Sequence, residues 1–168
     1  MFRGAQLWWR GQLHSLFLDF SDLDLAGASV NLSDCNEADI SSAVFRRTNL
    51  QNAVLSGCFV FADLSGAVLT GARMSGQFIR ANLVGADLRG AVDGRQNWLD
   101  FSGANLTNAN LAGADFTRTT MSRFLGPGIT QAVTVTGANL EGTRICTTVQ
   151  RDLVGYVGQP IIMPVPCR

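Results

Sequence analysis

The residues that could carry out catalysis are few and widely spaced. The single histidine, His14, lies near the N-terminus, and no serine or cysteine is spaced to act with it. All 13 basic residues are arginines, so only carboxylates remain as general bases. The 4 cysteines form no CxxC pair, and no glycine-rich phosphate-binding motif joins a strand to a helix. The sequence therefore predicts a protein that is not an enzyme and has no catalytic, metal or cofactor-binding residues.

The polar side chains are positioned by a repeat of five residues. Clear copies occupy residues 81–85, 86–90 and 104–108, where a small residue is followed by Asp or Asn and then by Leu. A fixed period of this kind predicts a solenoid, because each unit can bury its apolar side only against its neighbours. The small and the central residues are expected to point inward. The intervening Asp or Asn is expected to point outward and to bond to nearby backbone groups.

The register of the repeat shifts after the eighth, twelfth and sixteenth units. Shifts at multiples of four predict a coil with four sides, one corner of which tolerates changes in length. Units about four apart should then stack, and aromatic residues repeated along the axis can pack on one another. The expected aromatic column contains Phe20, Ile40, Phe59, Phe78, Phe101 and Met121.

The tandem Ala-(Asp/Asn)-Leu-x-x pattern resembles the pentapeptide-repeat family over most of the chain. The resemblance implies an all-β fold, a right-handed quadrilateral β-helix (a pentapeptide-repeat solenoid) of about six coils. We assign residues 1–17 to a short N-terminal cap or degenerate coil and residues 18–145 to the β-helix. Residues 146–168 form an irregular C-terminal tail.

Two segments interrupt the repeat and are expected to form loops near residues 92–98 and 123–132. Asp93 falls on a central position, where burying a carboxylate costs several kcal/mol, so Val92 to Trp98 should leave the tube. The segment carries Arg95, Asn97 and Trp98, and it is either a tolerated insertion or a loop that recognises a partner. The second interruption contains Gly126-Pro127-Gly128.

Further residues for binding a partner come from the repeat register and from the N-terminus. Val60, Phe61 and Ile79 should lie outward on adjacent coils, where an exposed apolar patch suits a homodimer or another partner. Trp8 and Trp9 either pack in the cap or anchor a partner.

The cysteines divide into repeat positions and tail positions. Cys35 is expected to be a buried core residue, and Cys58 is expected to point outward and be exposed. The C-terminal segment resembles that of exported or lumenal members of the family, which implies a disulfide between Cys146 and Cys167. No convincing export signal is present, so we expect a cytoplasmic protein, or a periplasmic or lumenal one if an export segment has been removed.

The composition limits the kinds of partner that the protein can bind. The 13 basic and 13 acidic residues balance, which predicts no affinity for nucleic acid, and no apolar run is long enough to span a membrane. The resemblance leaves two functions open, and both imply a protein partner. One is a protein-interaction or scaffold module, and the other is a DNA-mimicking inhibitor of type II topoisomerase (gyrase). Mimicry needs a long acidic face. Acidic residues gather between Asp19 and Asp39, but arginines follow them, which favours the interaction module.

Overall fold

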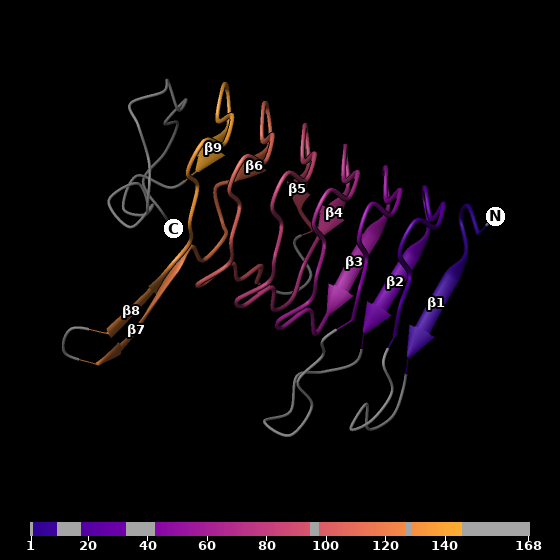
Figure 1. Ribbon diagram of the computed structural model, residues 1–168, viewed down its shortest axis with the longest axis horizontal. Coiled ribbons are helices and arrows are strands. Elements are labelled where there is room, and N and C mark those ends of the chain that lie inside the picture. Colours follow the sequence, from indigo (N-terminus) through magenta and orange to yellow (C-terminus); the bar gives the residue numbers. More distant parts are fainter. Residues whose placement is uncertain (1, 10–17, 33–42, 95–97, 127–128, 146–168) are drawn as a thin grey trace.

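A computed structural model describes residues 2–9, 18–32, 43–94, 98–126 and 129–145, and the chain winds through them as a parallel β-helix (Figure 1). One wall is a parallel sheet of seven strands in the order β1-β2-β3-β4-β5-β6-β9, one strand from each coil. The strands are β1 (Gln6–Trp9), β2 (Ser29–Leu32), β3 (Val54–Gly57), β4 (Arg73–Met74), β5 (Val92–Asp93), β6 (Asp115–Phe116) and β9 (Arg144–Ile145). The expected all-β solenoid is confirmed. The coil count differs slightly from six, because Gln6–Trp9 also joins the sheet.

The other three walls are ladders of single parallel bridges, so the tube has four faces. Face 3 is the seven-stranded sheet. The outward residues of face 1 are Asp19, Val44, Asp63, Asn82, Asn105 and Thr134; those of face 2 are Asp24, Asn49, Val68, Asp87, Asn110 and Asn139; and those of face 4 are Cys58, Gln77, Asp100 and Thr120. Each ladder joins one coil to the next through backbone hydrogen bonds, such as Leu64 N to Asn82 O at 2.7 Å.

The turns at the corners follow from the repeat itself. On faces 1 and 2 the outward Asp or Asn accepts the N–H two residues later, as Asp63 Oδ1 does from Ser65 N at 3.1 Å. This confirms the expected side-chain-to-backbone bonds. The next residue has positive φ, as Gly85 does at 66°, and glycine adopts this conformation without steric strain. Asn82 Nδ2 also donates to Asp63 Oδ1 at 3.1 Å, which links the turns of neighbouring coils.

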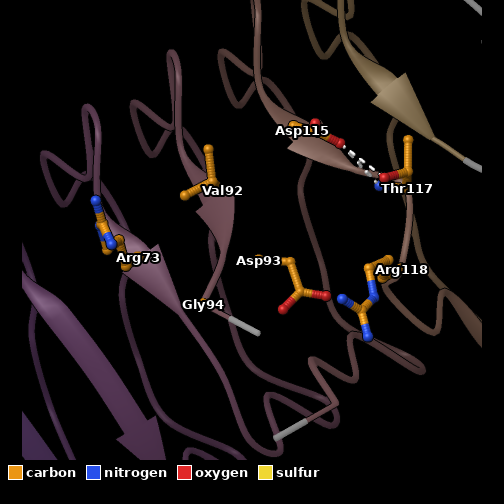
Figure 2. Close-up of a pocket in the computed structure, with 7 residues that line it drawn as sticks. All are labelled: Arg73, Val92, Asp93, Gly94, Asp115, Thr117 and Arg118. Atoms are coloured by element: carbon orange, nitrogen blue, oxygen red, sulfur yellow. Dashed lines mark hydrogen bonds between the residues drawn. The ribbon is translucent and has the colours of Figure 1, made fainter. Parts of the chain in front are cut away.

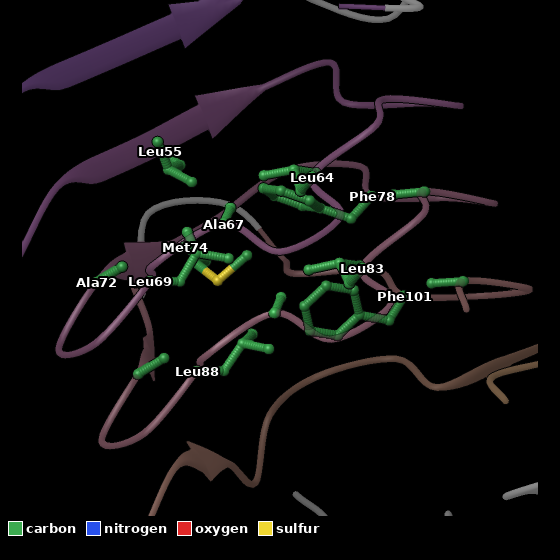
Figure 3. Packing of buried hydrophobic residues seen from close by; sticks show 14 of the residues in the cluster. Leu55, Leu64, Ala67, Leu69, Ala72, Met74, Phe78, Leu83, Leu88 and Phe101 are labelled. Atoms are coloured by element: carbon green, nitrogen blue, oxygen red, sulfur yellow. The ribbon is translucent and has the colours of Figure 1, made fainter. Parts of the chain in front are cut away.

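The core consists of the central and small residues of most described units (Figure 3). Face 2 contributes an unbroken row of leucines, and face 4 contributes an aromatic row in which Phe59 stacks on Phe78 at 4.4 Å. Phe78 in turn meets Phe101 edge-on at 5.5 Å. Burial of each large apolar side chain contributes about 1.5–3 kcal/mol, so this inner column is the main source of stability.

The predicted aromatic column is wrong in its first coil. Phe20 stacks on Phe45 at a centroid distance of 4.9 Å, whereas it was expected to align with Phe59 through Ile40. The reason is the length of the coil, because Asp22 and Arg47 on adjacent coils are 25 residues apart. A regular coil, from Asp63 to Asn82, has 19 residues. Ile40 itself lies outside the described residues.

The prediction for Cys58 is also wrong. Cys58 is 2% exposed and is disulfide-bonded, although it occupies an outward position of the repeat. An outward position of a ladder can thus be buried, as Val44 and Asp100 also are. Cys35, Cys146 and Cys167 lie outside the described residues, so neither the core position of Cys35 nor the predicted pairing of Cys146 with Cys167 is described.

The second interruption contains an antiparallel hairpin. Its strands are β7 (Ser122–Gly126) and β8 (Ile129–Ala132), and the register shifts between Phe124 and Gly126. The hairpin starts after Met121 on face 4 and returns at Val133, before face 1, and it projects away from the stacked coils (Figure 1). In the part of the chain that is described, no helix is long and apolar enough to cross a bilayer.

Candidate functional site

The departures from the repeat lie at the two edges of face 4. The edge toward face 3 carries the interruption that contains Gly94 and Trp98. The edge toward face 1 carries Phe61, Arg80 and the β7–β8 hairpin. Faces 1 and 2 meet at a corner that keeps its length in every described coil. The candidate functional site is therefore the side of the tube around face 4.

A pocket of about 370 Å³ lies where face 3 meets the first interruption (Figure 2). Three neighbouring strands and the segment after β6 supply its walls. The lining residues are Arg73, Val92, Asp93, Gly94, Asp115, Thr117 and Arg118. Val92 is the one large apolar residue among them, so the pocket is predominantly polar.

The pocket lies where the strand pairing of the sheet is shorter, between β5 and β6. These strands share one pair, Val92 with Asp115, whereas β4 and β5 share two. Asp93 is in register with Met74 of the preceding coil, but its side chain is only half-buried. The carboxylate thus avoids the dry core, and the chain leaves the sheet after Gly94, whose N–H donates to Met74 O at 2.7 Å.

This geometry corrects the predicted loop from Val92 to Trp98. Val92 and Asp93 remain in the sheet as β5, and the departure begins later. Residues 95–97 lie outside the described residues, so the expected roles of Arg95 and Asn97 stay predictions. Trp98, where the described chain resumes, is 72% exposed, although the next residue, Leu99, is fully buried.

The charges in the pocket are only partly neutralised within it. Asp115 accepts hydrogen bonds from Arg144 Nη1 at 2.8 Å and from Thr117 Oγ1 at 2.9 Å, so its charge is balanced from the next coil. Among the described residues, the guanidinium groups of Arg73 and Arg118 have no ion pair and no side-chain hydrogen bond. Asp93 is engaged in a further interaction. The pocket therefore offers two guanidinium groups to a ligand.

The charges on faces 1 and 2 are arranged in the opposite way. Asp22 is paired with Arg47 at 2.6 Å and Asp87 with Arg89 at 2.6 Å. Hydrogen bonds from these guanidinium groups hold the pKa of both carboxyl groups below their usual value. The pKa of Asp24 is lowered in the same way, chiefly by Arg3. Two residues of the acidic N-terminal region recognised in the sequence, Asp22 and Asp24, are thus paired with arginines, whereas residues 33–42 of that region lie outside the described residues.

The predicted apolar patch is present in part. Phe61 is 43% exposed, and the guanidinium of Arg80 lies over its ring at 5.7 Å. Val60 and Ile79 are half-buried. Phe61 and Arg80 both have positive φ, at 56° and 55°, a backbone conformation that is uncommon for bulky side chains. Strained residues of this kind are often found at functional sites.

Other residues predicted to bind a partner are not described in the same detail. Trp8 and Trp9 lie in β1, but their side chains are outside the described set. Arg73 and Arg118 were not recognised from the sequence as site residues. For Arg73, the stacking register could have indicated the site, because it places Met74, and hence Arg73, one coil from the break at Asp93. Among described residues, no group of three or more His, Cys, Asp or Glu could hold a metal ion.

Comparisons with solved structures return pentapeptide repeat proteins. A protein from the thylakoid lumen of Arabidopsis thaliana is 29% identical, with 66% of this chain and 72% of that chain covered and a TM-score of 0.38. QnrB1, a plasmid-mediated fluoroquinolone resistance protein, is 19% identical over 75% of this chain and 60% of that chain, with a TM-score of 0.35. HetL, which is involved in heterocyst differentiation regulation in the cyanobacterium Nostoc, is 25% identical over 75% of this chain and 71% of that chain, with a TM-score of 0.24.

The family assignment comes from the sequence model rather than from these superpositions. No curated protein sequence gives a significant match. The model for pentapeptide repeats matches 8 copies over residues 19–57, 58–92 and 99–123. The gap before residue 99 coincides with the segment that follows β5. The stacked five-residue units and this match together show that the chain belongs to the pentapeptide-repeat family.

Proposed function

We propose that the chain is a non-enzymatic protein-interaction module that binds a protein partner through the side around face 4. The observation that carries the proposal is Trp98, a large aromatic side chain left 72% exposed where the regular tube is interrupted. Tryptophan and arginine are enriched among residues that dominate binding energy at interfaces. Arg73, Arg118 and the Phe61–Arg80 pair are on β-helix coils that fix the positions of their backbones, which limits the backbone entropy lost on binding.

A matched pair of variants tests this proposal. Trp98→Ser removes the aromatic group from the interruption, and Val68→Ser changes an exposed residue on face 2. Affinity capture from the source cells, quantified by mass spectrometry, should yield at least one protein that is retained by the wild type and Val68→Ser but lost with Trp98→Ser. If the two variants retain the same proteins, the binding side has been placed wrongly. Sedimentation of the purified chain separates binding to a second copy from binding to another protein.

The charge pattern does not favour the alternative, a DNA-mimicking inhibitor of gyrase. A DNA mimic needs uncompensated negative charge along its length. Here Asp22, Asp24 and Asp63 are paired with Arg47, Arg3 and Arg46. We expect no inhibition of gyrase supercoiling by the purified chain, compared with an unrelated protein at the same concentration. Inhibition at a low concentration would overturn the interaction-module proposal in favour of mimicry.

The disulfide at Cys58 favours an oxidising compartment over the cytoplasm that we expected from the sequence. Thiol trapping at lysis tests this point. In denaturant, which exposes the buried residue, alkylation before reduction should leave Cys58 unmodified, and alkylation after reduction should modify it. Modification of Cys58 before reduction would show that the thiol is free, which would support a reducing compartment.

A further inference from the structure

The two unpaired guanidinium groups of the pocket set it apart from the rest of the surface. Arg3, Arg46, Arg47, Arg89 and Arg144 each form an ion pair with an aspartate. Arg80 lies over the Phe61 ring. Of the arginine side chains that the structure describes, only Arg73 and Arg118 lack such a contact, and both line the same pocket.

The position of these two residues is fixed by the sheet. Arg73 is on β4, and Arg118 follows β6 by two residues, so they flank β5 from either side. Val92 and Asp93 of β5 lie between them (Figure 2). A ligand in the pocket would therefore have one guanidinium group on either side of β5.

We propose that this pocket binds one carboxylate group of the protein partner, either an Asp or Glu side chain or the C-terminus. The inference rests on the proposed interaction function and names the chemistry that the pocket selects. Guanidinium groups bind carboxylates through paired, charge-assisted hydrogen bonds. A volume of about 370 Å³ accepts a carboxylate with the atoms next to it and falls within the usual range for small-ligand sites.

The acidic residue in the pocket limits the charge of the ligand. Asp93 lines the pocket beside the two arginines and has a further interaction of its own, and Asp115 is neutralised by Arg144. The two guanidinium groups therefore supply the positive charge of the pocket, and the Asp93 carboxylate adds negative charge at one wall. A ligand carboxylate with one negative charge is repelled less by Asp93 than a doubly charged phosphate is. The apolar surface of Val92 suits the carbon atoms next to the carboxylate.

The test uses N-acetylglycine, which presents one carboxylate beside a peptide group, in a titration followed by ¹H–¹⁵N NMR of the full chain. The amide signals of Gly94, Thr117 and Arg118 should shift with a single Kd. Arg73→Gln and Arg118→Gln should each raise that Kd about tenfold. Arg89→Gln is the matched control, because it removes the same charge from a paired arginine outside the pocket. It should leave the Kd unchanged.

Two further probes identify the ligand chemistry. N-acetylglycinamide, which lacks the carboxylate, should cause no shift, and inorganic phosphate should bind more weakly than N-acetylglycine. The proposal is overturned if those amides do not respond, if Arg89→Gln weakens binding as much as the pocket variants, or if phosphate binds more tightly. Unchanged spectra away from the pocket establish that each variant is folded. If Trp98→Ser abolishes partner capture but N-acetylglycine does not bind, the interaction function stands and the carboxylate site is rejected.

Discussion

Face 2 and face 4 enclose the same core but differ at their edges. Along face 2, each described coil turns with an outward residue, a positive-φ residue and a central leucine, so the wall repeats without interruption. Along face 4, the central column is equally well packed by Phe59, Phe78 and Phe101, yet insertions enter on both sides of it. A closed core therefore does not require corners of regular length. Binding features can therefore be added where coil length varies, at little cost to stability.

The largest expected effect tests this separation directly. Phe78→Ala should destabilise the fold by about 3–5 kcal/mol, because it empties the centre of a buried aromatic column. Trp98→Ala, on the same side of the tube, should change stability by less than about 0.5 kcal/mol because its side chain is largely exposed. Urea unfolding followed by circular dichroism measures both. Similar losses for the two variants would show that the insertion is part of the core.

A second comparison concerns glycines at two kinds of corner. Gly76→Ala should cost about 2–4 kcal/mol, because the added Cβ would lie 2.7 Å from Gly57 N and collide with the Gly57 carbonyl oxygen. Gly85→Ala has open space around the new Cβ and should cost about 1 kcal/mol, through its positive φ alone. Thermal unfolding of both variants measures the difference. Equal shifts in Tm would mean that the coils move apart easily at Gly57.

The paired charges of faces 1 and 2 predict that stability depends on pH, with a smaller effect than the two kinds of substitution above. The folded-state pKa of Asp22 and Asp87 lies below the ordinary value of 3.8, so their pairing stabilises the fold fully above pH 3.8. That contribution is lost as the pH falls through the lowered pKa. Tm should therefore drop as the pH falls below about 4, and Asp87→Asn should reduce the drop. The effect should be smaller than that of Phe78→Ala because the pairs are exposed. A pH profile unaffected by Asp87→Asn would exclude the pair as its source.

The smallest effect concerns the strained corner between face 4 and face 1. Phe61→Gly should stabilise the fold by about 0.5 kcal/mol, because relief of positive φ exceeds the lost contact with Arg80. The next coil but one has Gly103 at the equivalent position. Chemical unfolding measures the gain, and partner capture measures any loss of binding. A destabilised variant would show that Phe61 is retained for packing rather than for binding.

The sequence predicted the regular part of the fold well. The central residues from Phe59 to Leu88 lie in the core as expected, because a strict period leaves one way to stack them. The first coil was misaligned because its extra residues themselves follow the repeat, so Phe20 could not be assigned to Phe45 by counting. The repeat period identifies which positions point inward, but it does not give the number of units that separate two residues stacked on adjacent coils.

The candidate site was only partly predictable. Trp98 stood out because it follows the break in the repeat, and Phe61 stood out because it occupies an outward position. Arg73 and Arg118 did not, since each resembles any other outward arginine until the neighbouring coils show that no aspartate meets it. The disulfide of Cys58 was missed because the repeat period does not identify a covalent partner. Pairing between distant residues is the information that a local pattern lacks.

The regular coil of 19 residues between Asp63 and Asn82 has an evolutionary consequence. A gene duplication that copies residues 63–81 would insert one more coil with all four ladders in step, because each bridge would find a partner of the same kind. The copy would separate Phe61 from the Val92 and Asp93 wall of the pocket by one additional strand spacing, about 4.8 Å. The distance between the two features can thus change in fixed increments without any new corner. In lineages that gain or lose such copies, the distance between Phe61 and the pocket would change, and partners of different size would fit.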